Sequence, residues 1–202
     1  MKKLLLLFTL LFSFSVATMA VDYAKEVLDK AASTIKSAGD VKIGFTLTAD
    51  GSSSDGYIKL KGQKFVMNVG GTITWFDGKT MWSYVKQNEE VNVTTPTATE
   101  VAKMNPYAFL SFYKKGYTAK KGNPTRKEYE VILTGNDASH YKKVVIRVNR
   151  FSNIPSYISI TSQKDNVTTI NCNSFQKNQK YTDDTFKFNK KNYPNVEVVD
   201  LR

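Results

Sequence analysis

Apolar and polar residues alternate along most of the chain from residue 41 onward. In the first such run Val41, Ile43, Phe45 and Leu47 are apolar, and Lys, Gly and Thr stand between them. Successive side chains of a strand point to opposite faces of its sheet, so this alternation predicts a half-buried β-strand. The further predicted strands are 57–61, 64–69, the two strands of a hairpin at 73–84, 90–94, 117–121, 128–134, 141–148, 155–162, 167–175 and 186–189.

Two stretches are helical in character instead. Apolar residues recur every three or four positions in 21–35, which predicts an amphipathic helix that ends near Gly39. The stretch 96–113 predicts two short helices divided at Asn105-Pro106, because proline is costly inside a helix. About ten strands with these helices predict an α+β fold, a large curved antiparallel sheet with helices covering one face.

The strongest turn signal lies in the stretch 73–84, where Asp77-Gly78 separates two runs rich in aromatic and β-branched residues. This pattern predicts a tight hairpin. With an even number of loop residues, Trp75 lies opposite Thr80, and Ile73 lies opposite Trp82. The apolar residues that then share one face are Ile73, Trp75, Trp82 and Tyr84. Both tryptophans of the chain therefore stand on one apolar face.

The first twenty residues have the pattern of a secretory signal peptide. Two lysines precede an uncharged apolar run at 4–16, and small residues lead to a predicted cleavage site after Ala20. The apolar run is short for a membrane span, so an uncleaved anchor is the weaker alternative. We therefore expect residues 1–20 to be a signal peptide and residues 21–202 to form one domain.

The composition is basic, with 29 Lys and Arg residues against 18 Asp and Glu residues. The lysines are scattered, and no arginine cluster stands beside stacking aromatic residues, which argues against nucleic acid as a partner. For an exported protein, this charge favours solubility or attraction to anionic membranes and partners.

The sequence offers little for catalysis. The one histidine, His140, follows a predicted hairpin turn, where a solvated residue is the expected role. The chain has no Cys/His cluster with metal-ligand spacing, no Gly-x-Ser-x-Gly motif and no glycine-rich phosphate loop. We therefore predict no catalytic residue, no metal site and no cofactor, and we expect that the protein is not an enzyme.

The remaining candidates are apolar side chains on the predicted sheet and on the two short helices. They form either an ordinary core or a hydrophobic cavity closed by a lid, and periodicity does not separate these interpretations. Methionine in a lid would suit adaptable binding. The candidate residues are Phe65, Met67, Ile73, Trp75, Trp82, Tyr84, Met104, Phe109, Leu110 and Phe112.

The segment 75–84, Trp-Phe-Asp-Gly-Lys-Thr-Met-Trp-Ser-Tyr, resembles the Asp-Gly-Lys-Thr-Leu-Trp-x-Tyr motif of the outer-membrane lipoprotein carrier protein family, LolA. The resemblance covers nearly the whole mature chain, including the Asn105-Pro106 insertion and the closing segments 185–188 and 196–200. It implies an incomplete antiparallel β-barrel of about ten or eleven strands, with helices on the concave face as a lid. The candidate apolar residues then bind the acyl chains of cargo.

The resemblance also implies a function and partners. A protein of this family carries triacylated lipoproteins through the periplasm, from an inner-membrane ABC transporter complex to the outer membrane, where an acceptor could receive them. We expect a monomer. Two alternatives stay open: a periplasmic module of the same fold that senses lipid or lipoprotein and regulates a partner, and an enzyme that acts on envelope lipids or glycans.

One position departs from the family pattern. The arginine that latches the lid in this family falls on or near Lys61. Lysine is a point donor without the planar fork of a guanidinium, so it bonds fewer lid carbonyls at once. We carry the latch over to Lys61 as an expectation that the resemblance implies.

Overall fold

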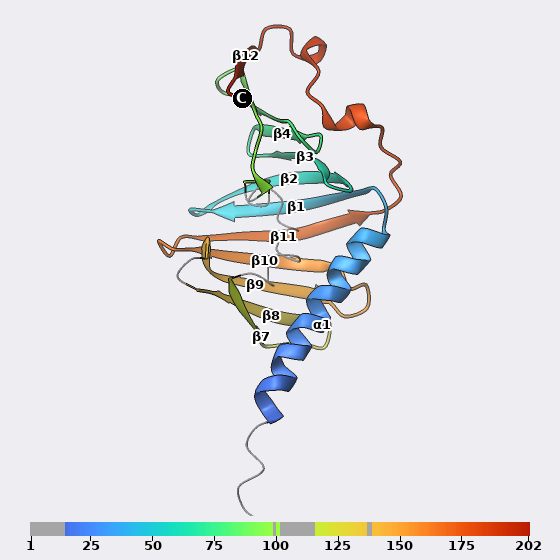
Figure 1. Cartoon of the computed structure of the whole chain (residues 1–202), viewed down its shortest axis with the longest axis vertical. Coiled ribbons are helices and arrows are strands. Elements are labelled where there is room, and N and C mark those ends of the chain that lie inside the picture. The colour runs from blue at the N-terminus through green and yellow to red at the C-terminus, as the bar shows by residue number, and fades with distance from the viewer. Residues whose placement is uncertain (1–14, 99, 102–115, 137–138) are drawn as a thin grey trace, which may run out of the picture.

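A computed structural model describes residues 15–98, 100–101, 116–136 and 139–202 of the chain (Figure 1). The described residues include a long helix, α1 (Ser15–Ser37), and a sheet of twelve strands in the order β12-β6-β5-β4-β3-β2-β1-β11-β10-β9-β8-β7. The strands are β1 (Val41–Ala49), β2 (Ser52–Lys61), β3 (Lys64–Val69), β4 (Thr72–Phe76), β5 (Met81–Val85), β6 (Glu90–Thr94), β7 (Tyr117–Lys121), β8 (Glu128–Gly135), β9 (Tyr141–Asn149), β10 (Pro155–Ser162), β11 (Val167–Gln176) and β12 (Glu197–Asp200).

The predicted class of fold is confirmed at this level: the sheet is open, curved and mostly antiparallel. Its strands number twelve rather than ten or eleven, because the C-terminal tail adds β12 in parallel to β6. The predicted strand at 186–189 is wrong. That part of the chain follows a 3-10 helix, η2 (Asp183–Phe186), and precedes a second one, η3 (Lys190–Asn192). Backbone turn bonds, such as Lys187 N to Asp184 O at 3.3 Å, take the place of ladder bonds there.

Helix α1 lies across the strands at the β7 end of the sheet (Figure 1). Ala24, Val27, Leu28 and Ala31 are buried, as the three- and four-residue spacing predicts. The described part of the helix already includes residues 15–20, so it extends back past the predicted cleavage site, which stays a prediction. None of the helices in the described part of the chain is long and apolar enough to cross a membrane.

The main core lies between α1 and the face of the sheet on which α1 packs, which we call the inner face. Alternate residues of the central strands point to it, and the largest of them are fully or almost fully buried. These residues are Ile43, Phe45, Ile58, Phe65, Leu133 and Ile146. The opposite face of the sheet is called the outer face.

The chain between β6 and β7 connects two distant parts of the sheet. Strand β6 lies next to the edge strand β12, whereas β7 forms the opposite edge. The connection from residue 95 to residue 116 must therefore reach from one side of the curved sheet to the other. This is the part of the chain in which the sequence predicts the lid.

Candidate functional site

The turn of the β4–β5 hairpin is built around the side chain of Asp77. Its Oδ1 atom accepts hydrogen bonds from the backbone N–H groups of Lys79 (2.9 Å) and Thr80 (2.8 Å). Gly78 adopts a φ of 102°, which a residue with a side chain rarely takes. Asp77 N also donates to Thr80 O at 3.2 Å, so residues 77–80 form a four-residue turn.

This longer turn shifts the register of the hairpin by two residues. Trp75 lies opposite Trp82, and Ile73 lies opposite Tyr84. The predicted pairs of Trp75 with Thr80 and of Ile73 with Trp82 are therefore wrong. A shift of two residues leaves every side chain on its own face, because strand side chains alternate with a period of two. The prediction that the four apolar residues share a face is confirmed.

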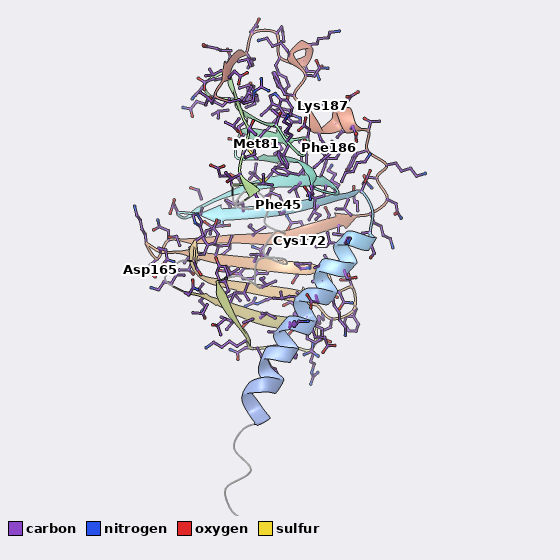
Figure 2. All side chains as sticks on the ribbon, viewed as in Figure 1. Phe45, Met81, Asp165, Cys172, Phe186 and Lys187 are labelled. Atoms are coloured by element: carbon purple, nitrogen blue, oxygen red, sulfur yellow. The ribbon has the colours of Figure 1, made fainter. Side chains whose placement is uncertain are left out.

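That shared face is the outer one, and residues 177–196, which we call the C-terminal segment, cover it. Trp75 is only 8% exposed, and its ring lies 5.7 Å from the Phe188 ring and 5.8 Å from the Tyr193 ring. The Tyr84 and Tyr193 rings pack in a tilted arrangement with centroids 5.0 Å apart. Phe186 is fully buried in the same cluster, beside the upper strands in Figure 2. The tryptophan face is thus packed against the protein's own chain.

Lysine side chains fasten the C-terminal segment to the sheet. Lys61 Nζ donates to Tyr181 O at 2.6 Å and lies 3.5 Å from Asp183 Oδ1, while Lys64 Nζ lies 2.8 Å from Asp183 Oδ2. The hydrogen bond and charge of Lys64, with the charge of Lys61 added, lower the pKa of Asp183. The described contacts of Lys61 are therefore with the C-terminal segment. A contact between Lys61 and the predicted lid at 102–115 lies outside the described residues.

Two of the predicted binding residues lie on the inner face instead. Phe65 is fully buried and packs on Phe76 with ring centroids 5.5 Å apart. Met67 is half-buried and packs against the same core cluster, which also contains Met81. The sheet therefore separates Phe65 and Met67 from the tryptophans. These side chains do not line one cavity, contrary to what their grouping in the prediction implies.

The sequence analysis missed several inner-face neighbours of Phe65. They are Phe45, Ile58, Leu60, Phe76 and Met81. The alternation of side chains along a strand could have identified two of them. Phe76 and Met81 are adjacent in sequence to Trp75 and Trp82, so they point to the opposite face. The prediction instead singled out the two tryptophans, which lie on the outer face of the hairpin.

The apolar part of the inner face ends at β4 and β5. Thr74 is 1% exposed, and its Oγ1 lies 3.5 Å from Ser83 Oγ. On β6, Asn92 Nδ2 donates to Glu90 Oε1 at 2.6 Å. The inner face therefore changes from apolar to polar toward the edge at which the crossing connection begins.

The predicted lid begins with a capping box. Thr97 N donates to Glu100 Oε2 at 2.7 Å, and Glu100 N donates to Thr97 Oγ1 at 3.3 Å. Residues 98, 100 and 101 are helical, and Val101 packs against the inner-face core. The chain thus enters the predicted lid on the inner side of the sheet. The predicted lid residues Met104, Phe109, Leu110 and Phe112 lie outside the described residues.

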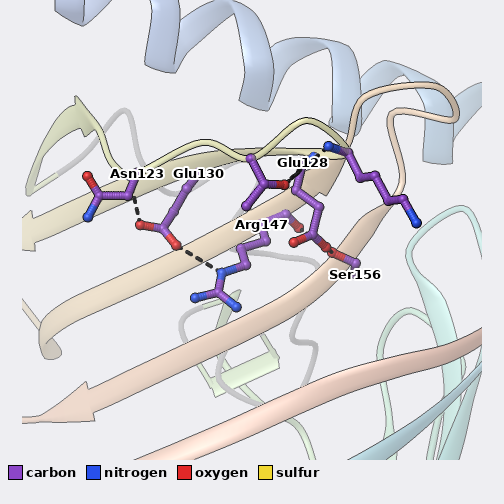
Figure 3. Close-up of polar contacts among 7 residues, drawn as sticks. Asn123, Glu128, Glu130, Arg147 and Ser156 are labelled. Atoms are coloured by element: carbon purple, nitrogen blue, oxygen red, sulfur yellow. Dashed lines mark hydrogen bonds and ion pairs between the residues drawn. The ribbon is translucent and has the colours of Figure 1, made fainter.

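Among the described residues, the most buried acidic group lies on the outer face of β8 and β9 (Figure 3). Glu130 is 8% exposed and accepts hydrogen bonds from Asn123 N (3.0 Å) and Arg147 Nε (2.9 Å). Burial alone raises the pKa of Glu130, but the bonds from Asn123 and Arg147 outweigh it, so the pKa is lowered. Gly122 leaves the space that the carboxylate fills. This arrangement is that of a satisfied structural ion pair rather than a proton donor.

The other titratable candidate, His140, is exposed in the turn before β9, and its ring packs edge-on against Tyr141 at 5.2 Å. In the described part of the chain, no three His, Cys, Asp or Glu residues are grouped closely enough to hold a metal ion. What this geometry offers chemically is apolar surface on the inner face.

Several solved structures are similar to the chain at low sequence identity. An uncharacterized conserved protein from Thermus thermophilus has a TM-score of 0.63 and 10% identity, over 88% of this chain and 99% of that one. A DUF1329 family protein from Desulfovibrio piger has a TM-score of 0.50 and 12% identity, over 83% and 97% of the two chains. A putative outer membrane lipoprotein-sorting protein domain from Vibrio parahaemolyticus has a TM-score of 0.49 and 12% identity, over 83% and 97%.

At such identities, structural similarity concerns the fold alone. A comparison with curated protein sequences gave no match. A family model, described as outer membrane lipoprotein carrier protein LolA, matches residues 14–186, which include the hairpin, the crossing connection and the first turn of the C-terminal segment. The chain therefore belongs to the LolA family of outer-membrane lipoprotein carrier proteins.

Proposed function

We propose that this protein is a periplasmic carrier that holds the acyl chains of lipoproteins against the inner face of its sheet. The observation that carries the proposal is the continuous apolar surface formed there by Phe45, Ile58, Phe65, Phe76 and Met81. Membership of a family of carriers rather than enzymes supports it. We assign to the crossing connection from residue 95 to residue 116 the role of covering this surface when no cargo is bound.

Acyl chains need such a surface because exposing them to water is costly. Each CH₂ group contributes about 0.8 kcal/mol when it leaves water for an apolar environment, so the chains of a triacylated lipoprotein cannot cross the periplasm bare. A bilayer and an apolar cavity solvate these chains about equally well. Loading must therefore be driven from outside, and we assign this role to an inner-membrane ABC transporter complex, with an outer-membrane acceptor as the destination.

Cargo must also compete with the protein's own side chains. Phe65 and Ile58 are 0% exposed, so acyl chains gain access only when the groups that cover the inner face move away. A ligand shifts such an equilibrium only by its preference for the open state. This competition keeps the empty carrier from exposing a large apolar surface.

Adjacent residues on opposite faces of β3 provide the sharpest test. Met67 points to the inner face and Asn68 to the outer face, and both are half-buried. We expect Met67→Asp to weaken binding of a fluorescent acyl probe by about tenfold or more, because a carboxylate is costly to bury beside an acyl chain. Met67→Leu and Asn68→Asp should bind like the wild type. Equal weakening by Met67→Asp and Asn68→Asp, or none by either, contradicts the proposal.

A second test addresses the predicted lid. We expect Met104→Asp and Phe109→Asp to abolish the release of lipoproteins from spheroplasts, while circular dichroism shows an unchanged fold. A charge at either position opposes the apolar contacts that a lid needs with both the sheet and the cargo. Undiminished release by both variants contradicts the role of this segment as a lid.

A further inference from the structure

The two rims of the sheet, where the strands end in turns, differ in charge. One rim, which we call the basic rim, consists of the turns 38–40, 62–63, 77–80, 122–127 and 150–154, together with residues 177–180 after β11. It carries six cations and two carboxylates. The cations are Lys79, Arg126, Lys127, Arg150, Lys177 and Lys180. The described turns of the opposite rim carry Lys86 and Lys164 against Asp50, Glu89 and Asp165.

Both carboxylates of the basic rim are occupied by backbone groups. Asp40 Oδ2 accepts a hydrogen bond from Tyr181 N at 2.7 Å, and Asp77 holds its own turn. Arg126 and Lys127 are exposed, and no ion pair of either side chain occurs among the described residues. Their charges therefore remain available to an anionic surface.

A large aromatic side chain stands at the tip of the same rim. Phe151, in the β9–β10 turn, is 83% exposed. The turn is held firmly, because Asn149 Oδ1 accepts hydrogen bonds from the backbone of Phe151 (3.0 Å) and Ser152 (3.1 Å). Asn153 N donates to Asn149 O at 2.9 Å and closes the turn. The phenyl ring is thus presented to solvent by a rigid support.

The aromatic tip and the free cations belong to neighbouring turns. Arg150 N donates to Lys127 O at 2.9 Å, which joins the β9–β10 turn to the β7–β8 turn. The β9–β10 turn extends to the right of α1 in Figure 1. The Cζ atom of Arg150 lies 4.4 Å from the centroid of the Tyr129 ring, and this contact supports the junction of the two turns from the inner side. Phe151 therefore belongs to a turn that is hydrogen-bonded to the turn carrying Arg126 and Lys127.

We propose that this tip docks the protein on a bilayer that contains anionic phospholipids. The Phe151 ring then lies at the boundary between headgroups and acyl chains, and Arg126 and Lys127 contact the phosphates. An exposed aromatic ring beside Lys and Arg is suited to the membrane interface. A standard protein interface buries about 800 Å² on each partner, far more than one side chain at the tip of a turn offers. The other exposed large hydrophobic residues among those described lie elsewhere, Val167 on the opposite rim and Val198 and Leu201 at the β12 edge.

Cosedimentation of the purified empty protein with vesicles tests the proposal. The vesicles contain phosphatidylcholine with phosphatidylglycerol, or phosphatidylcholine alone. We expect Phe151→Ala to weaken partitioning to the anionic vesicles about tenfold, the loss expected for one large apolar side chain. The pair Arg126→Gln and Lys127→Gln should weaken it about 25-fold, at about fivefold for each charge. All variants have the same N-terminal residues, so any contribution of these residues to vesicle binding cancels when the variants are compared.

Matched variants on the opposite rim serve as controls. Val167→Ala removes an exposed apolar side chain, and the pair Lys86→Gln and Lys164→Gln removes the same net charge. Both should partition within about twofold of the wild type, because neither touches the tip. The proposal is wrong if the control variants lose as much partitioning to anionic vesicles as the tip variants do. It is also wrong if the wild type binds phosphatidylcholine vesicles as well as anionic ones.

A tryptophan at the tip reports whether it enters the bilayer. We expect Phe151→Trp to show a blue-shifted emission when anionic vesicles are added, relative to wild type. The proposal is overturned if removing the two charges abolishes binding while Phe151→Ala has no effect and the emission of Phe151→Trp does not shift. That result favours an acidic protein partner instead. Because the protein is empty in this experiment, the result does not depend on acyl-chain binding.

Discussion

Both faces of strands β3 to β5 carry buried apolar side chains, yet different parts of the chain cover them. On the outer face, Trp75 and Tyr84 pack against Phe188 and Tyr193 of the C-terminal segment. On the inner face, Phe65 belongs to the core shared with α1, which Val101 reaches at the entrance to the crossing connection. Two similar surfaces thus have unlike covers.

Hydrophobicity alone does not distinguish a core from a binding site. The distinction depends on how firmly the segment that covers the apolar surface is held in place. The cover of the outer face is pinned by Lys61 and Lys64, and it continues into β12, whose pairing with β6 holds its far end. A surface closed in this way stabilises the fold. The cover that we propose for the inner face is the connection between β6 and β7, two strands that lie far apart in the sheet.

The largest effect is expected from Phe186, the buried anchor of the outer cover. Phe186→Ala should lower the free energy of unfolding by about 3–5 kcal/mol, because it leaves a cavity in a fully buried site. Urea unfolding measures this loss. Under conditions in which the variant is folded, its affinity for an acyl probe should equal that of the wild type. Loss of affinity without loss of stability contradicts the division between the faces.

The sequence predicts most of the strands, because alternation is a local property. The predicted strand 141–148 differs from β9 by one residue, and 155–162 coincides with β10. Parity also places the four apolar hairpin residues on one face. The segment 185–188 alternates in the same way but does not join the sheet, since Phe186 is anchored in the aromatic cluster by η2.

What covers each face is not a local property, and here the sequence falls short. Trp75 and Tyr193 are far apart in the chain, and nothing near either residue specifies that they meet. The parallel pairing of β12 with β6 likewise joins distant segments. The family pattern points to Lys61 as a residue that fastens a cover, but its described partner is Tyr181 of the C-terminal segment.

An intermediate effect is expected from Gly56, which makes room for the inner-face core. A Cβ atom at this position meets Asn68 O at 2.6 Å and the Phe45 ring at 2.9 Å. We expect Gly56→Ala to destabilise the protein by about 1–3 kcal/mol through overpacking. Because the Phe45 ring must shift along the inner face, acyl-probe affinity should change as well, unlike in Phe186→Ala.

Gly44→Ala is the matched control on the outer face of the neighbouring strand. Its Cβ meets Ser174 Oγ at 2.7 Å, and this hydroxyl can rotate away if it gives up the hydrogen bond that it accepts from Gly44 N at 3.2 Å. Unfolding and probe titration on both variants separate the faces. Equal changes in probe affinity would show that the inner face is not the binding surface.

The smallest effect is expected from Asp183, whose ion pairs with Lys61 and Lys64 are partly exposed to solvent. Asp183→Asn should loosen the C-terminal segment and increase acrylamide quenching of tryptophan fluorescence, with little change in the unfolding midpoint. The pKa of Asp183 is lowered in the folded state, chiefly by Lys64. Its contribution is therefore full above the unfolded pKa and is lost as the pH falls through the folded pKa.

The quenching difference between wild type and Asp183→Asn should accordingly disappear in acid, when the wild-type carboxyl takes up its proton. Acyl-probe affinity at neutral pH should be the same for both proteins, because Asp183 acts on the outer cover alone. If Asp183→Asn instead raises the rate of probe uptake, the C-terminal segment takes part in opening the inner face. The two covers would then move together, and the distinction between a fixed and a movable cover would fail.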